Sequence, residues 1–147
     1  MKLAVYIVED EPLIQDSLKV VIEGYLRAEV MGAAPSEAEA VAWLRANDGG
    51  WHLLVVDLNL AQGSGLGVLA AVAGARVEDA SSGGAGGDGK RRGKARVKGV
   101  VVALTNAASA GNRAECLRLG ADAVFDKAAE INQFLAYCEK KIPGAMA

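Results

Sequence analysis

Three short runs of apolar residues each end abruptly at a polar side chain, and this pattern restricts the folds open to the chain. The runs cover residues 3–8, 53–56 and 100–104, and they stop at Glu9, Asp57 and Thr105. A short run without polar alternation is typical of a strand that is buried on both faces, as in a parallel sheet. Each run is far shorter than the roughly 20 residues that a membrane-spanning helix needs.

Segments with a helical pattern separate these runs. Apolar residues recur at helical spacing from Leu13 to Tyr25, after a proline that suits the first turn of a helix. Further helices are expected from Pro35 onward and over residues 64–75, 108–119 and 128–141, with shorter strands at 28–33 and 123–125. Because strand and helix alternate five times, the sequence predicts an α/β fold with a doubly wound, five-stranded parallel sheet and helices on both faces.

One segment interrupts this alternation. Residues 81–89 contain five glycines, and residues 90–98 contain six of the 16 lysines and arginines. Such a composition disfavours a packed element, so residues 76–98 are expected to form a flexible, basic insertion. We predict one domain over residues 1–141, insertion included, followed by a short tail over residues 142–147.

Polar side chains suited to one reaction follow the predicted strands. Glu9 and Asp10 follow the first strand, Asp57 the third, Thr105 the fourth and Lys127 the fifth. In a parallel sheet the carboxyl ends of all strands lie at one edge, where open α/β folds bind ligands. Each residue alone is as well explained by a solvated loop, but their order and placement together predict one shared pocket.

Three carboxylates in one pocket repel one another, and a divalent cation relieves that repulsion. Mg²⁺ suits such a site because it prefers oxygen ligands and keeps waters or phosphate oxygens among them. Asp57 can then attack a phosphoryl group to give an acyl phosphate. Lys127 can supply a positive charge for a phosphoryl oxygen, and Thr105 can supply a hydroxyl donor. The pattern therefore favours Mg²⁺-dependent phosphoryl transfer.

With these residues in this order, the chain resembles the CheY-like receiver domains of two-component response regulators, from Met1 to about Lys141. Gly120-Ala121-Asp122, before the last strand, also matches the family pattern. The resemblance implies the flavodoxin-like strand order 2-1-3-4-5. It further implies that Asp57 is the phosphoacceptor, taking its phosphoryl group from a phosphohistidine of a sensor histidine kinase or a histidine phosphotransfer protein.

The resemblance also assigns roles to the other residues of the site. Asp10 matches the direct metal ligand, and Glu9 matches the neighbour that acts through water. Asn59 matches the position whose backbone carbonyl completes the metal site. Thr105 matches the switch hydroxyl, and Lys127 the lysine that pairs with the phosphoryl group.

Several positions depart from the family pattern. Ala61 and Ala128 stand where the family has prolines, and the second change makes a trans peptide after the lysine the default. Val124 occupies the usual aromatic switch position, so a rotating aromatic is lost there or its role has shifted to Phe125. Asn106 replaces a residue that is usually smaller, which can narrow access to the acyl phosphate.

These observations lead us to expect a single-domain response regulator in the cytoplasm. It is not expected to be an enzyme but a phosphoacceptor that autophosphorylates and autodephosphorylates with Mg²⁺. Phosphorylation would control the binding of a downstream protein through the last strand and helix, as a population shift. No membrane association is expected. Direct DNA binding is not expected either, because no aromatic residue lies near the basic run and no helix-turn-helix pattern follows it.

Other functions stay open at this point. The chain could be a receiver that is no longer phosphorylated and serves as a protein-binding module, or the receiver part of a longer transcriptional regulator. Gly63-Ser64-Gly65-Leu66-Gly67 is a weak signal for nucleotide binding. Its distance from Asp57 and its spacing favour turn and helix-start glycines instead.

The thiols and the imidazole add no further site to these expectations. Cys116 and Cys138 lie on different predicted helices without the spacing of metal ligands, so buried or half-buried thiols are expected. His52 is the one histidine of the chain, and its place just before a strand predicts a surface residue.

Overall fold

The computed structural model describes residues 2–47, 49–74 and 99–145, so the predicted insertion at 76–98 lies outside the described residues. The strands are β1 (Leu3–Val8), β2 (Ala28–Ala34), β3 (Leu53–Val56), β4 (Val100–Thr105) and β5 (Ala123–Asp126). The helices are α1 (Pro12–Tyr25), α2 (Glu37–Ala46), α5 (Ala110–Arg118) and α6 (Ile131–Lys141), and a further helix covers residues 65–74.

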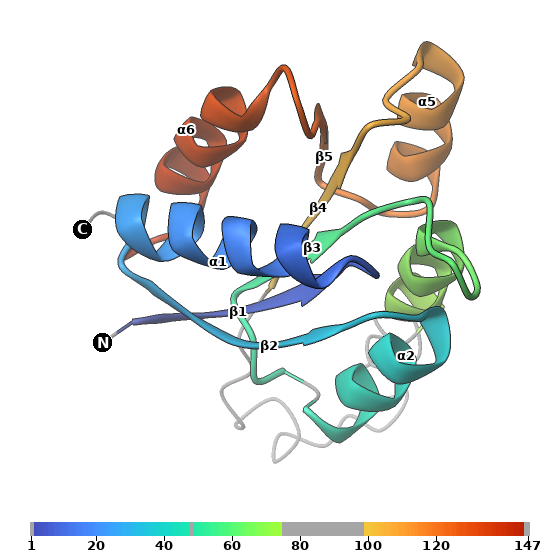
Figure 1. The fold of residues 1–147 in the computed structure, drawn as a ribbon, viewed down its shortest axis with the longest axis horizontal. Helices are drawn as coiled ribbons and strands as arrows, with labels where there is room; N and C mark the ends of the chain where they lie inside the picture. The colour runs from blue at the N-terminus through green and yellow to red at the C-terminus, as the bar shows by residue number, and fades with distance from the viewer. Residues whose placement is uncertain (1, 48, 75–98, 146–147) are drawn as a thin grey trace, which may run out of the picture.

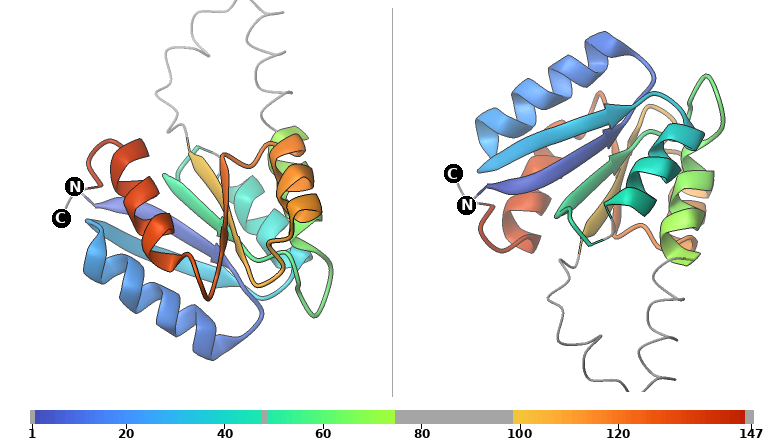
Figure 2. Two further views of the ribbon diagram at one scale, coloured as in Figure 1. Left: turned by 90° about the horizontal axis from the view of Figure 1, so that it is seen from above. Right: turned by 90° about the horizontal axis from the view of Figure 1, so that it is seen from below.

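The five strands form one parallel sheet in the order β2-β1-β3-β4-β5 (Figure 1), which confirms the predicted fold class and strand order. Helices α1 and α6 cover one face of the sheet, and α2, the 65–74 helix and α5 cover the other (Figure 2). Strands β1 and β3, which Glu9 and Asp57 follow directly, are neighbours in the sheet.

The apolar runs are explained by a core on each side of this sheet. In β1, Val5 and Ile7 pack toward α1 and α6, whereas Tyr6 and Val8 pack toward the opposite helices. All four side chains are at most 4% exposed. Burial of one such side chain contributes about 1.5–3 kcal/mol, so a strand with both faces covered cannot alternate with polar residues without a large loss of stability.

Helix α1 buries a narrower stripe than its apolar spacing suggests. Leu18 and Ile22 are buried, but Leu13 is 80% exposed. At about 100° per residue, Leu13 lies on the opposite side of the helix from Ile22. Val20 lies on the same side as Leu13 and is also exposed, so α1 presents apolar side chains to its outer surface.

Helix α5 ends as its sequence predicts. Gly120 has a φ of 102°, and its amide donates to the carbonyl of Leu117 while the amide of Ala121 donates to the carbonyl of Cys116. These two hydrogen bonds form a Schellman cap, which favours glycine at the left-handed position. The chain then enters β5 directly at Ala123.

The core continues past residue 141, the limit of the predicted domain. Ile142 and Ala145 are buried in the cluster formed with α1 and α6. The carbonyl of Ala145 also accepts a hydrogen bond from the amide of Arg27, just before β2. Residues 142–145 therefore tie the end of α6 to the edge of the sheet.

Both cysteines are free and buried, as expected from the sequence. Burial raises the pKa of the Cys138 thiol to about 12, which keeps it protonated at neutral pH. His52 differs from its expected place at the surface, because it is half-buried and its Nδ1 accepts a hydrogen bond from the amide of Ala4 at 2.8 Å. None of the helices in the described ranges is long and apolar enough to span a membrane.

The glycines after β3 allow close approach between neighbouring segments. A side chain at Gly65 would collide with the backbone carbonyl of Asp57, and one at Gly67 would collide with the carboxylate of Glu37. That carboxylate also accepts a hydrogen bond from the amide of Ser64 at 2.9 Å. These contacts explain the glycine pattern by packing around the Asp57 loop, in agreement with the turn and helix-start interpretation.

We expect Gly65→Ala to destabilise the protein, because its neighbours are backbone atoms that cannot turn aside. Overpacking of this kind costs about 1–3 kcal/mol. Gly24→Ala is the matched control, since Gly24 lies inside α1 with nothing within 4 Å of an added Cβ. It should raise the free energy of unfolding by up to about 1 kcal/mol. Urea unfolding measures both changes, and a stabilised Gly65→Ala would contradict the close approach to Asp57.

Candidate metal centre

Three carboxylates from the ends of two adjacent strands meet at one edge of the sheet. Glu9 and Asp10 follow β1, and Asp57 follows β3. One oxygen from each carboxylate lies within 4.8 Å of the other two. Glu9 is 1% exposed and Asp57 7% exposed, so two of the three acids are buried. The predicted convergence of these acids is present in the fold.

Lys127 joins this cluster from the end of β5, at the same edge of the sheet. Its Nζ lies 2.5 Å from Oε1 of Glu9 and 2.7 Å from Oδ2 of Asp57. Its side chain is only 11% exposed. The lysine follows β5, two strands away from β3, and its amide donates to the carbonyl of Thr105 at the end of β4. Lys127 thus pairs with two of the three carboxylates, Glu9 and Asp57.

Burial dominates the electrostatics of this cluster. It raises the pKa of Glu9, and the charge of Asp57 adds to that rise, while hydrogen bonds from Lys127 and the Glu11 amide oppose it. Burial also pulls the pKa of Lys127 down, but its hydrogen bonds to Asp57 and Glu9 outweigh this effect and raise the pKa overall. Lys127 is therefore charged at neutral pH.

The loop after β3 folds back onto the acids. The amide of Asn59 donates to Oδ1 of Asp57 at 3.2 Å, and the amide of Ala61 donates to Oδ2 of Asp10 at 2.7 Å. A β-bridge between Asn59 and Ser64 closes this loop. A proline in place of Ala61 has no amide hydrogen to donate. The departure at this position therefore supplies a hydrogen bond that holds Asp10.

Thr105 lies fully buried at the end of β4. Its Oγ1 accepts a hydrogen bond from the amide of Ala107 at 3.1 Å, and its carbonyl accepts the amide of Lys127. A hydroxyl that accepts one hydrogen bond still carries a proton that it can donate. The structure thus links Thr105 to Lys127 through the backbone, while the role of its hydroxyl stays a prediction.

The turn that carries Lys127 is built without proline. No cis peptide bond occurs in the described ranges, in line with the trans bond expected before Ala128. Oδ1 of Asp126 accepts the amides of Ala128 and Ala129, and Glu130 accepts the amide of Asp126. Because these bonds form a separate turn, α6 begins at Ile131 and not at the predicted residue 128.

The two candidates for an aromatic switch face opposite sides of β5. Val124 is buried among the side chains on the α5 side of the sheet. Phe125 packs edge-on against Phe134 and Tyr137, which belong to α6. Phe125 therefore does not occupy the place that an aromatic residue at position 124 would have.

Sequence reasoning missed several residues that support the cluster. Gln15 donates from Nε2 to the backbone carbonyl of Glu9 at 2.6 Å. Glu37 fixes the start of the 65–74 helix, and Arg113 pairs with Glu130 at 2.7 Å. Asp126 offered a sequence signal, because an aspartate shortly before a helix often accepts hydrogen bonds from nearby amides.

Glu9 should give the metal-free protein a measurable pH dependence. Its folded-state pKa is raised above the ordinary value of 4.5, so the folded protein holds this proton to higher pH than the unfolded chain does. Stability should therefore fall as the pH rises from about 4.5 through the raised pKa. Urea unfolding in the presence of EDTA should show this loss in the unmodified protein and not in Glu9→Gln.

The matched control is Glu29→Gln, which changes an exposed glutamate of β2. It should follow the unmodified protein across the whole pH series. An identical pH dependence in Glu9→Gln would contradict the assignment of this effect to the buried carboxylate.

Comparisons with known proteins place this geometry among known folds. No protein-family model matches the sequence, and a search of curated proteins found no significant match. Solved structures do match. A two-component response regulator of the LuxR family from Aurantimonas sp. SI85-9A1 is 16% identical, with a TM-score of 0.73, over 100% of this chain and 89% of that one.

Two further structures agree with this match. A CheY-like response regulator receiver domain protein from Methanospirillum hungatei JF-1 is 23% identical, with a TM-score of 0.68, over 96% of this chain and 94% of that one. A chain of the CheX–CheY–BeF3–Mg complex from Borrelia burgdorferi is 14% identical, with a TM-score of 0.73, over 94% and 87%. The chain therefore has the fold of the CheY-like receiver domains of two-component response regulators.

Proposed function

We propose that the chain is a phosphoacceptor that receives a phosphoryl group on Asp57 from a phosphohistidine. The observation that best supports this proposal is that Lys127 bridges Glu9 and Asp57 within a cluster of three carboxylates at the carboxyl edge of the sheet. In the transfer, an Asp57 carboxylate oxygen bonds to phosphorus. The bond between phosphorus and the imidazole nitrogen breaks, and its electron pair returns to the ring.

The donors of the cluster fit a hard divalent cation. Carboxylate oxygens within 4.8 Å of one another are the ligands that Mg²⁺ prefers. Asp10 and Asp57 would bind the ion directly, with the carbonyl of Asn59, and Glu9 would act through a water molecule. Bound Mg²⁺ would neutralise part of the charge on the phosphoryl oxygens. The Ala61 amide holds Asp10 in place for this role.

Two side chains are suited to stabilise the phosphorylated state. Lys127 already pairs with the acceptor carboxylate, so a short movement of its Nζ would let it pair with a phosphoryl oxygen. Thr105 would turn its hydroxyl proton toward the same group. Because the backbones of Thr105 and Lys127 are hydrogen bonded, both movements would affect β5 and the start of α6. This response would shift the equilibrium between conformations of the surface that a downstream protein binds.

The proposed partners follow from this chemistry. A sensor histidine kinase or a histidine phosphotransfer protein in the cytoplasm would supply the phosphohistidine. The matched CheX–CheY structure contains beryllofluoride and Mg²⁺, which supports a phosphoryl and metal site on this fold without identifying a partner for this chain. A non-phosphorylated protein-binding module and the receiver part of a longer regulator are the alternatives.

Acetyl phosphate with Mg²⁺ should phosphorylate the protein, because the site needs only a reactive phosphoryl donor once the cation is bound. Intact-protein mass spectrometry should show the gain of one phosphoryl group. Asp57→Asn should remove the gain, whereas Asp16→Asn, which changes an exposed acid on α1, should keep it. An unmodified mass with acetyl phosphate and with a histidine kinase would instead support the protein-binding module.

Mg²⁺ should also stabilise the folded protein, since the ion binds a site that the unfolded chain lacks. At a concentration one hundred times Kd, the gain is about 2.7 kcal/mol. Asp10→Asn should lose most of this gain in urea unfolding with and without Mg²⁺, and Asp16→Asn should keep it. An equal gain in Asp10→Asn would place the cation elsewhere.

A further inference from the structure

The turn that carries Lys127 is tied to α5 by one arginine. Nε of Arg113 donates to the carbonyl of Ala108 at 3.0 Å, and one terminal nitrogen donates to the carbonyl of Val124 at 3.0 Å. The other terminal nitrogen donates to Oε1 of Glu130 at 2.7 Å. A planar guanidinium donates in fixed directions, so it holds the loop after β4, the strand β5 and the start of α6 in one arrangement.

Glu130 passes this constraint to the turn itself. The oxygen that pairs with Arg113 also accepts the amide of Asp126 at 2.8 Å. Asp126 in turn binds the amides of Ala128 and Ala129. The backbone is thus hydrogen bonded on both sides of Lys127, so the ammonium is directed toward Asp57 from a fixed base.

We infer that Arg113 and Glu130 are positioning residues that hold Lys127 in place for a phosphoryl group on Asp57. The inference rests on the proposed function, which gives Lys127 that role. The residue after the lysine is alanine, so no proline ring restrains the turn. The Arg113–Glu130 pair and the Asp126 carboxylate supply the restraint through hydrogen bonds.

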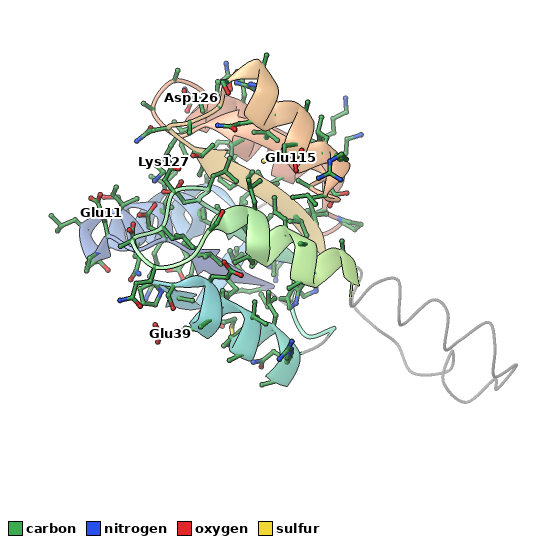
Figure 3. All side chains as sticks on the ribbon, turned by 90° about the vertical axis from the view of Figure 1, so that its right-hand side faces the viewer. Glu11, Glu39, Glu115, Asp126 and Lys127 are labelled. Carbon is green, nitrogen blue, oxygen red and sulfur yellow. The ribbon has the colours of Figure 1, made fainter. Side chains whose placement is uncertain are left out.

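The same helix carries a pair that serves as a control. Glu115 and Arg118 also form an ion pair on α5, but both belong to this one helix and their side chains are 40% and 66% exposed. Figure 3 shows Asp126 and Lys127 together at one edge of the molecule, with Glu115 lying away from both. Loss of the Glu115 pair removes an interaction on α5 without touching the turn.

The test is the affinity for beryllofluoride, a phosphoryl mimic, measured by calorimetry in the presence of Mg²⁺. Glu130→Ala should weaken this affinity roughly tenfold, as losses of orienting residues generally do. Glu130→Gln should lose less, because its amide oxygen can still accept from Arg113 and Asp126. Glu115→Ala should change nothing. The affinity for Mg²⁺ alone should not fall in any of these variants, because Lys127 is not a metal ligand and its ammonium competes with the ion for Glu9 and Asp57.

A double-mutant cycle separates positioning from general loosening. In the Lys127→Ala background, Glu130→Ala should cause no further loss of beryllofluoride affinity. Additive losses, or a parallel loss of Mg²⁺ affinity, would overturn the inference. Should Glu130→Ala fail to fold, Arg113→Lys takes its place, because lysine keeps the charge but lacks the three-way fork.

The cycle also separates this inference from the proposed function. If the unmodified protein binds neither beryllofluoride nor a phosphoryl group at Asp57, both the proposed function and the inference fail. If it binds beryllofluoride and Glu130→Ala binds equally well, the inference alone fails.

Discussion

The ammonium of Lys127 between two buried carboxylates is the interaction on which the rest of the site depends. Glu9 and Asp57 are nearly inaccessible to water, and charges in such places need a partner close by. Lys127 is that partner at 2.5 and 2.7 Å. The pairing requires β1 and β3 to be neighbours and β5 to end at the same edge of the sheet. The strand order meets both requirements.

This arrangement also explains why a fold with such a polar edge is stable. The two apolar cores lie on the faces of the sheet, away from the cluster, and they include most of the buried side chains. The acids are then held by bonds from nearby backbone, such as the Ala61 amide on Asp10 and the Glu11 amide on Glu9. The apolar cores thus stabilise the sheet, and backbone amides at its edge hold the acids.

The strands and the convergence of the acids could be predicted from the sequence, because buried parallel strands appear in it as uninterrupted apolar runs. Several details of the helices and of the side-chain contacts were not predicted. Leu13 was counted in the apolar pattern of α1, although at about 100° per residue it lies on the side opposite Ile22, and it is exposed. The start of α6 was placed three residues early, because the bonds of Asp126 and Glu130 to the turn cannot be read from periodicity. Arg113 gave no local signal, since all of its acceptors are distant in sequence or in loops.

The departures from the family pattern become understandable in the same physical terms. Alanine at position 61 provides an amide hydrogen, and alanine at position 128 permits a trans turn held by carboxylates. Val124 and Phe125 lie on opposite faces of β5, so Phe125, which packs on α6, does not take the place of an aromatic residue at position 124.

A crystal structure with Mg²⁺ and beryllofluoride is the most direct test of the proposal that Asp57 accepts a phosphoryl group beside Lys127. We expect beryllofluoride on the Asp57 carboxylate, Mg²⁺ bound by Asp10, Asp57 and the Asn59 carbonyl, and the Nζ of Lys127 moved from Glu9 to a fluorine atom. A structure in which Lys127 keeps both carboxylates at the distances seen here, with neither ligand bound under saturating conditions, would contradict it.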